Sequence, residues 1–291
     1  DEKVLDIAIT ANRPDGMSID GIAREVSALT ESTLRIPELQ YKIETKLFNH
    51  NSIDNDLVDK NGLFTLTTIG DLDGGTKSPK WLKSRLQNCG INSLNAIVDI
   101  TNYIQLEQGQ PQHAYDLDKL EVLTGKSVNH ENFSIRKASD GELFTALDGN
   151  TYNLNSKCTL ITCHDIPIAI AGVIGGLQSA VSDSTKRIVL ECALFNPTSV
   201  RNSARSVGIR TESSSRFEKG ISIELTLPSL ARNIDILSQV FTPKIQKTSV
   251  DKENKRQKYT ILLRKNRINE ILGPILLNNQ TKSNYNSNES N

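Results

Sequence analysis

An acidic residue, Glu191, lies in an otherwise apolar segment of the sequence, RIVLECALF (187–195). Side chains alternate between the two faces of a strand, so both faces of this segment carry apolar neighbours of Glu191. A carboxylate in such surroundings must be paired, hydrogen-bonded or at the edge of a pocket, because an unpaired buried charge is costly. Two roles stay open: a salt bridge to an arginine such as Arg201 or Arg205, and a hydrogen bond to a polar group of a ligand.

A second set of polar residues lies on a nearly uncharged helix that the apolar spacing predicts over 93–107. Asp99 is the only charge in most of this helix, and a polar stripe along it ends at Asn102. We expect a helix that is covered on most sides, with polar groups that find partners inside the protein. The chain then breaks at Pro111, which favours an extended approach, and His113 follows in a short loop. This order predicts one wall of a pocket.

Several common kinds of site are absent from the sequence. No Ser-His-Asp or Cys-His arrangement is evident, so we do not expect covalent catalysis. The glycine cluster 171–176 ends a predicted strand and either forms a turn or lets a ligand approach closely. It lacks the lysine and spacing of a nucleotide-binding P-loop. The cysteines have no metal-ligand spacing and read as free thiols of a reducing compartment. They are Cys89, Cys158, Cys163 and Cys192.

The overall charge argues against a protein that binds nucleic acid mainly by bulk electrostatics. Of the 291 residues, 34 are Lys or Arg and 34 are Asp or Glu, which gives a net charge of zero. Any nucleic-acid contact must therefore be local. The sequence has no apolar run of the roughly 18–20 residues that a membrane span needs, and no signal peptide. It opens on Asp1, and its only methionine is Met17, so we expect an internal piece of a longer protein.

The elements that must position these residues predict an α+β fold. We expect mixed or antiparallel sheets built from about 60–70 and 133–193, with helices 79–90, 93–107 and 197–207 packed on them. Helix boundaries are well marked, for example by an asparagine, a proline and a glycine around 197–207. The other predicted elements are strands 5–10 and 187–195, a hairpin over 143–154, and helices 18–30 and 225–241.

Five blocks occur in a fixed order along the chain: TANRPDGMSIDGIAREV (10–26), NAIVDITNYIQLEQGQPQHAYDLDKL (95–120), AGVIGG (171–176), LECALFNP (190–197) and IRTESSSRFEKG (209–220). Together they resemble the β subunit of bacterial-type phenylalanyl-tRNA synthetase. The central region of such subunits is the B3/B4 domain, an editing module that hydrolyses tyrosine wrongly attached to the phenylalanine tRNA. The resemblance implies a B3/B4-type fold here.

The same resemblance divides the chain into parts. It implies the second half of a small B1-like domain over 1–40, the B3/B4 domain over 41–245 and a charged linker over 246–258. The start of a B5-like domain, with its first strand and helix, is expected over 259–277. The asparagine-rich tail 278–291 has no apolar period, and we expect it to be disordered.

The resemblance also assigns roles to residues. It implies that Glu191 hydrogen-bonds the tyrosine hydroxyl, since phenylalanine would leave such a buried group unpaired. It places the hydrolysis at Thr101, Asn102 and His113, with His113 positioning water or the ribose. Ester hydrolysis needs an oriented water more than a strong base. The implied pocket walls are Pro111, Gly175, Thr211 and Ser213.

Two features of the sequence leave the function open: Ser213, and the segment 41–78, where the match to the family is weakest. Ser213 stands where the family often has alanine, so a non-editing scaffold for the α subunit and tRNA is the alternative to an editing site. A free-standing domain acting in trans is disfavoured by the B1-like and B5-like flanks. Arg85, Arg205 and Arg210 are candidates for tRNA contact, with solvated surface as the alternative.

The resemblance implies partners and cofactors for the whole enzyme. They are an α subunit in an α2β2 tetramer, the phenylalanine tRNA, and ATP with Mg2+ for the ligase reaction. No cofactor, metal or membrane contact is expected in this region. Usage rich in asparagine, isoleucine and lysine suggests an AT-rich genome, so the expected location is the cytoplasm or a plastid stroma.

Overall fold

The computed structural model describes residues 3–47, 57–59, 62–252 and 260–273. It divides into two units, 1–255 and 256–291. In the second unit, helix α8 (Lys265–Leu272) follows residues 260–264, which form no strand, so the strand expected at the start of a B5-like domain is not found there. No helix in the described ranges has the length and apolar character to cross a membrane.

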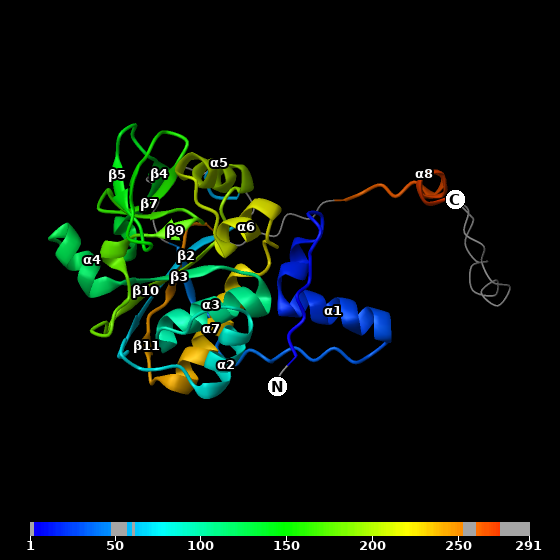
Figure 1. The fold of residues 1–291 in the computed structure, drawn as a ribbon, viewed down its shortest axis with the longest axis horizontal. Coiled ribbons are helices and arrows are strands. Elements are labelled where there is room, and N and C mark those ends of the chain that lie inside the picture. The colour runs from blue at the N-terminus through cyan, green and yellow to red at the C-terminus, as the bar shows by residue number, and fades with distance from the viewer. Residues whose placement is uncertain (1–2, 48–56, 60–61, 253–259, 274–291) are drawn as a thin grey trace. The chain divides into compact units, whose positions relative to one another are not determined.

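A mixed sheet forms the centre of the first unit (Figure 1). Strand β10 (Ile188–Ala193) lies antiparallel between β2 (Phe64–Gly70) and β3 (Gln112–Asp116). All six residues of β10 are buried. The outer strands of the sheet are short: β1 (Thr45–Leu47), β11 (Lys244–Ile245) and β12 (Thr248–Val250), of which β1 and β12 run parallel.

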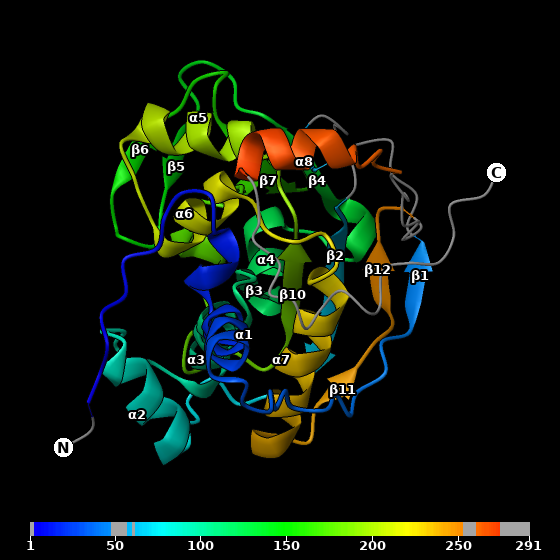
Figure 2. The same ribbon diagram turned by 90° about the vertical axis from the view of Figure 1, so that its right-hand side faces the viewer.

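Helices cover one face of this sheet. They are α2 (Lys80–Asn88), α3 (Ala96–Gln108) and α7 (Thr226–Val240), as Figure 2 shows for α3 and α7. Ile188 and Leu190 of β10 join the apolar cluster beneath these helices, together with Ile100 and Ile234. The alternation along β10 thus places every second residue in this layer, as the sequence predicted.

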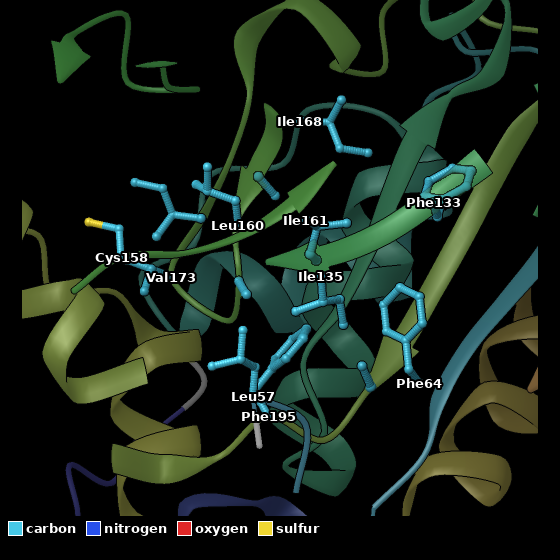
Figure 3. Close-up of a cluster of buried hydrophobic side chains, with 14 of the residues drawn as sticks. Leu57, Phe64, Phe133, Ile135, Cys158, Leu160, Ile161, Ile168, Val173 and Phe195 are labelled. Atoms are coloured by element: carbon cyan, nitrogen blue, oxygen red, sulfur yellow. The ribbon is translucent and has the colours of Figure 1, made fainter. Parts of the chain in front are cut away.

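The opposite face of the sheet packs on a second, antiparallel sheet of four strands. These are β4 (Phe133–Lys137), β7 (Thr159–Cys163), β8 (Ile166–Ile170) and β9 (Ile174–Gly175). Figure 3 shows the buried cluster between the layers, where Phe64 lies beside Ile135, Phe133 and Phe195. The remaining elements of this side are the hairpin β5 (Leu143–Thr145) and β6 (Thr151–Asn153), and the helices α4 (Leu117–Thr124), α5 (Pro197–Val207) and α6 (Glu212–Lys219). The predicted α+β fold is confirmed.

Helix α3 is buried along most of its length because its polar groups find partners. Asn95 caps it, with its side chain accepting from the Val98 amide at 3.0 Å. The fully buried Asp99 accepts hydrogen bonds from the hydroxyls of Ser78 and Ser93 and from the Leu94 amide. Gly109, whose backbone has the left-handed conformation, ends the helix. Three donors on one carboxylate explain how a charge remains inside this layer.

Three predicted segments differ in the structure. His113, expected in a short loop, lies in strand β3, because residues 112–116 pair with β10. Residues 5–10 form no strand, because no other described segment pairs with them and a strand needs a ladder partner. Helix α1 (Ile19–Thr30) does follow, after the short helix η1 (Pro14–Met17). At the other end, the predicted linker 246–258 begins with β12, whose three residues are buried against β2. Two further short helices are η2 (His130–Asn132) and η3 (Leu177–Ser179).

Candidate active site

A cavity of about 450 Å³ opens between α3, α6 and the ends of β3, β9 and β10. This volume lies within the range of small-molecule sites. All eight residues that the sequence analysis assigned to catalysis and substrate binding line it. They are Thr101, Asn102, Pro111, His113, Gly175, Glu191, Thr211 and Ser213.

Sheet register brings the side chains of Glu191 and His113 together. Glu191 of β10 pairs directly with His113 of β3, so both side chains leave the same face of the sheet. Tyr115, two residues further along β3, shares this face and donates a hydrogen bond from its hydroxyl to Glu191 Oε2 at 2.9 Å. Its ring meets the His113 ring edge to face, with centroids 4.5 Å apart.

Glu191 has a tyrosine as its partner and not an arginine. Within the described residues no ion pair reaches Glu191, and Arg201 lies instead near Glu218, with 3.9 Å between Nε and Oε2. Burial raises the pKa of Glu191 to about 7, and the hydrogen bond from Tyr115 opposes that shift. The salt-bridge alternative is therefore not what the structure contains.

His113 is half-buried as a residue. Its ring nitrogen Nε2 is buried and has no hydrogen-bond partner among the described residues. Burial lowers the pKa of His113 to about 4, so the imidazole is neutral at pH 7. The ring packs directly on Gly175, where an added Cβ would lie 2.4 Å from Cε1 and 2.6 Å from Nε2. Space for the imidazole, and not backbone conformation, thus requires glycine at this position.

The two threonines of the cavity use their hydroxyls to hold the fold. Thr101 donates to the Val98 carbonyl oxygen at 2.7 Å. Thr211 caps α6 by accepting from the Ser214 amide at 3.0 Å, and it donates to the Val173 carbonyl oxygen at 2.9 Å. Both hydroxyls are therefore engaged before any ligand arrives.

Three of the predicted site residues keep polar groups that a ligand could bind. In the described part of the chain, the half-buried amide of Asn102 makes no hydrogen bond, nor does Glu191 Oε1. His113 Nε2 is the third such group. Unpaired polar groups at the wall of a cavity are what a bound polar molecule would satisfy.

Ser213 also lines the cavity, and its hydroxyl donates to Gln105 Oε1 of α3 at 2.7 Å. The hydroxyl that departs from the family pattern is thus tied to a neighbouring helix. Sequence analysis missed Gln105 and Tyr115. Period two along β3 places Tyr115 beside His113, which is a signal that the sequence does contain, whereas the contact of Gln105 depends on how α6 meets α3.

The three arginines proposed to contact tRNA lie outside the cavity. Arg85 donates to the Tyr103 hydroxyl at 2.6 Å and stacks over the Trp81 ring at 5.3 Å. Arg210 makes one long hydrogen bond, 3.3 Å from Nε to the Ser215 hydroxyl. Arg205 is exposed on α5. Their roles stay predictions. In the described residues, no group of three His, Cys, Asp or Glu side chains could hold a metal ion.

Sequence comparison matches this chain to one domain family and to several longer relatives. The family model described as "B3/4 domain" matches residues 60–242. A protein named phenylalanine–tRNA ligase beta subunit from Prochlorococcus marinus subsp. pastoris is 50% identical over 283 residues, covering 97% of this chain and 34% of that protein. The proteins of that name from Parasynechococcus marenigrum and a Synechococcus species are 46% and 47% identical, over 94% of this chain and 34% and 33% of their lengths. The chain therefore spans about a third of these curated relatives.

Proposed function

Because this chain belongs to the B3/4 domain family, we propose that it is the editing module of a phenylalanine–tRNA ligase β subunit. Its cavity would hydrolyse the ester that joins tyrosine to the phenylalanine tRNA. The observation that carries this proposal is the pairing of Glu191 with His113 across two strands, at the wall of a partly enclosed, largely apolar cavity.

Glu191 is proposed to select tyrosine by its hydroxyl. The phenol of a bound tyrosine donates to Glu191 Oε1, the carboxylate oxygen that Tyr115 leaves unoccupied. Phenylalanine has no such donor and would leave a buried carboxylate without its second partner, which disfavours its binding. A hydrogen bond to a charged group contributes about 1.5–3 kcal/mol, or roughly 10–150-fold in selectivity.

His113 and Asn102 are proposed to hold the attacking water. The neutral imidazole can accept a hydrogen bond from water at Nε2, and the free Asn102 amide can bind the water or the ester carbonyl. Water then adds to the carbonyl carbon, and the bond to the ribose oxygen breaks with transfer of a proton to that oxygen. The products are free tyrosine and an uncharged tRNA end, with no covalent enzyme intermediate.

The partners and cofactors of a whole ligase belong to the same proposal. An α subunit and the phenylalanine tRNA would assemble with the full β subunit, and ATP with Mg2+ would serve the aminoacylation site outside this chain. The names of the longer relatives support this assignment.

The test is deacylation of tyrosine- and phenylalanine-charged tRNA by the full β subunit with its α partner. The wild type should clear the tyrosine ester far faster, and Glu191→Ala should lose most of that ratio. The variant should still fold, because it strands one Tyr115 hydroxyl at a cost of about 1–3 kcal/mol. Breaking a buried salt bridge would cost roughly 3–5 kcal/mol. Equal, slow clearance of both esters by the wild type would favour the scaffold alternative.

A further inference from the structure

We propose that Tyr115 is a positioning residue for selectivity: its hydroxyl holds one oxygen of the Glu191 carboxylate so that the other is presented to the phenol of tyrosine. This inference rests on the proposed editing function. It adds a residue whose hydroxyl acts through Glu191 and does not need to touch the ester bond.

Tyr115 is itself held rigidly. Its side chain is fully buried, and its ring lies against the rings of His113 and Phe133, at centroid distances of 4.5 and 6.0 Å. Its strand is fixed by pairing with β10 on one side, where Tyr115 stands opposite Val189. A donor fixed in this way also fixes the carboxylate to which it donates, 2.9 Å away.

The hydrogen bond from Tyr115 favours the ionised form of Glu191 and so lowers its pKa, against the effect of burial. The groups that face Glu191 and Tyr115 are His113 on β3 and Cys163 on β7, while Leu66 of β2 opposite Glu191 is apolar. Cys192 follows Glu191 on β10 and brings no positive charge. His113 is neutral, so burial and Tyr115 are the two opposing influences on the Glu191 carboxylate.

The ionised carboxylate is the better acceptor for a phenol. Selectivity for tyrosine over phenylalanine should therefore increase as the pH rises through the pKa of Glu191, which lies at about 7. Removing the Tyr115 hydroxyl removes a donor to the ionised form, so the midpoint should move to higher pH. The ratio of the two deacylation rates isolates this effect, because hydroxide-driven ester hydrolysis acts on both substrates alike.

The experiment compares the wild type with Tyr115→Phe in the full αβ enzyme, between pH 6 and 9. We expect the midpoint of the tyrosine-to-phenylalanine ratio to rise by about one pH unit or more, with a ratio near pH 7 that is lower by roughly fivefold or more. Tyr152→Phe is the matched control, since Tyr152 also donates to a carboxylate, Asp148, at 2.6 Å, outside the cavity. It should leave both the ratio and its midpoint unchanged.

Two further variants complete the test. Glu191→Gln should abolish the pH dependence of the ratio, and adding Tyr115→Phe to it should change the ratio no further. Incorporating 3-fluorotyrosine at position 115 gives a stronger donor with almost the same ring, so the midpoint should move to lower pH. This variant keeps the inference testable even where Tyr115→Phe fails to fold.

The outcomes separate this inference from the proposed function. A wild type without selectivity contradicts the editing function itself. Selectivity that depends on Glu191 but has the same ratio and midpoint in Tyr115→Phe keeps that function and overturns the role of Tyr115. A ratio that falls equally at every pH, together with a lower melting temperature, makes Tyr115 a packing residue and also overturns the inference.

Discussion

Burial and one hydrogen bond act on the Glu191 carboxylate in opposite directions, and burial dominates. Its pKa rises from 4.5 to about 7. His113, directly across the sheet, shifts the other way, to about 4. Between these two values both side chains are neutral. Near neutral pH, Glu191 is the group that changes its charge.

The raised pKa of Glu191 makes a prediction about stability. The folded state binds this proton more tightly than the unfolded state, so the free energy of unfolding falls as the pH rises from about 4.5 to about 7, by up to about 3 kcal/mol. Glu191→Gln removes this contribution and still accepts from Tyr115. Relative to the wild type, the variant should gain stability between pH 5 and pH 8, measured by urea unfolding. An equal difference at both pH values would contradict it.

At the scale of elements, the short strand β9 acts as a spacer for the imidazole on β3. Gly175 of β9 lies so close to His113 that a methyl group would overlap the ring. Gly175→Ala should displace His113 and slow hydrolysis of the tyrosine ester by about tenfold or more, since small displacements in an active site are costly. Gly75→Ala is the control, because its Cβ would meet no atom closer than 3.6 Å. Equal rates for the two variants would mean that His113 does not position the water.

Longer elements of the fold could be predicted from the sequence, and the shortest strands could not. The alternation in β10 and the punctuation of α3 and α5 are local signals, and those elements form as predicted. Strands of two or three residues, such as β11 and β12, are too short to carry a pattern. Residues 5–10 carry the pattern without a partner in the described chain.

Eight residues that line the candidate site were predicted, but their hydrogen-bond partners were not. Glu191, Asn102, Pro111 and His113 were singled out by their sequence surroundings, and a resemblance completed the set of eight. The structure brings all eight to one cavity, and their roles stay predictions. The partners that set their chemistry did not follow from the sequence. Tyr115 reaches Glu191 only through the register of β3 and β10, and Gln105 meets Ser213 only through the docking of α6 on α3. Contacts of this kind are decided by tertiary packing, which a periodic pattern does not encode.

At the scale of the whole molecule, the net charge is zero, so any electrostatic contact with a nucleic acid depends on local, unpaired positive residues. Positive residues from 201 to 219 are partly neutralised, because Arg216 pairs with Glu212 at 2.6 Å and Arg201 lies near Glu218. Within the described residues Arg205 has no ion pair, and Arg210 has none either. Lys219 has no ion pair there either, and electrostatic contact of this segment with a nucleic acid would fall to these residues.

This charge distribution predicts which of the three arginines contribute to tRNA binding and which contributes to stability. Arg205→Ala with Arg210→Ala should weaken binding of the phenylalanine tRNA by the full enzyme and reduce the slope of log K against log salt by about 1 for each phosphate that is no longer neutralised. Arg85→Ala should leave that slope unchanged and lower the melting temperature, because Arg85 bridges Trp81 and Tyr103. Filter binding at several salt concentrations and a thermal melt measure both. A slope that changes only with Arg85 would reverse the assignment.

The two faces of β10 determine which residues of the cavity can be substituted during evolution. One face carries Glu191 and the other carries Leu190 and Cys192 in the layer beneath α3 and α7. A shift of one residue in this strand would move the carboxylate into that layer and the apolar side chains into the cavity. Mutations can therefore not alter the specificity of the site through a register shift of β10. Adaptation to a different ligand is left to the helical walls of the cavity, where Ser213 on α6 and Val98 on α3 can each be exchanged without altering the sheet's register.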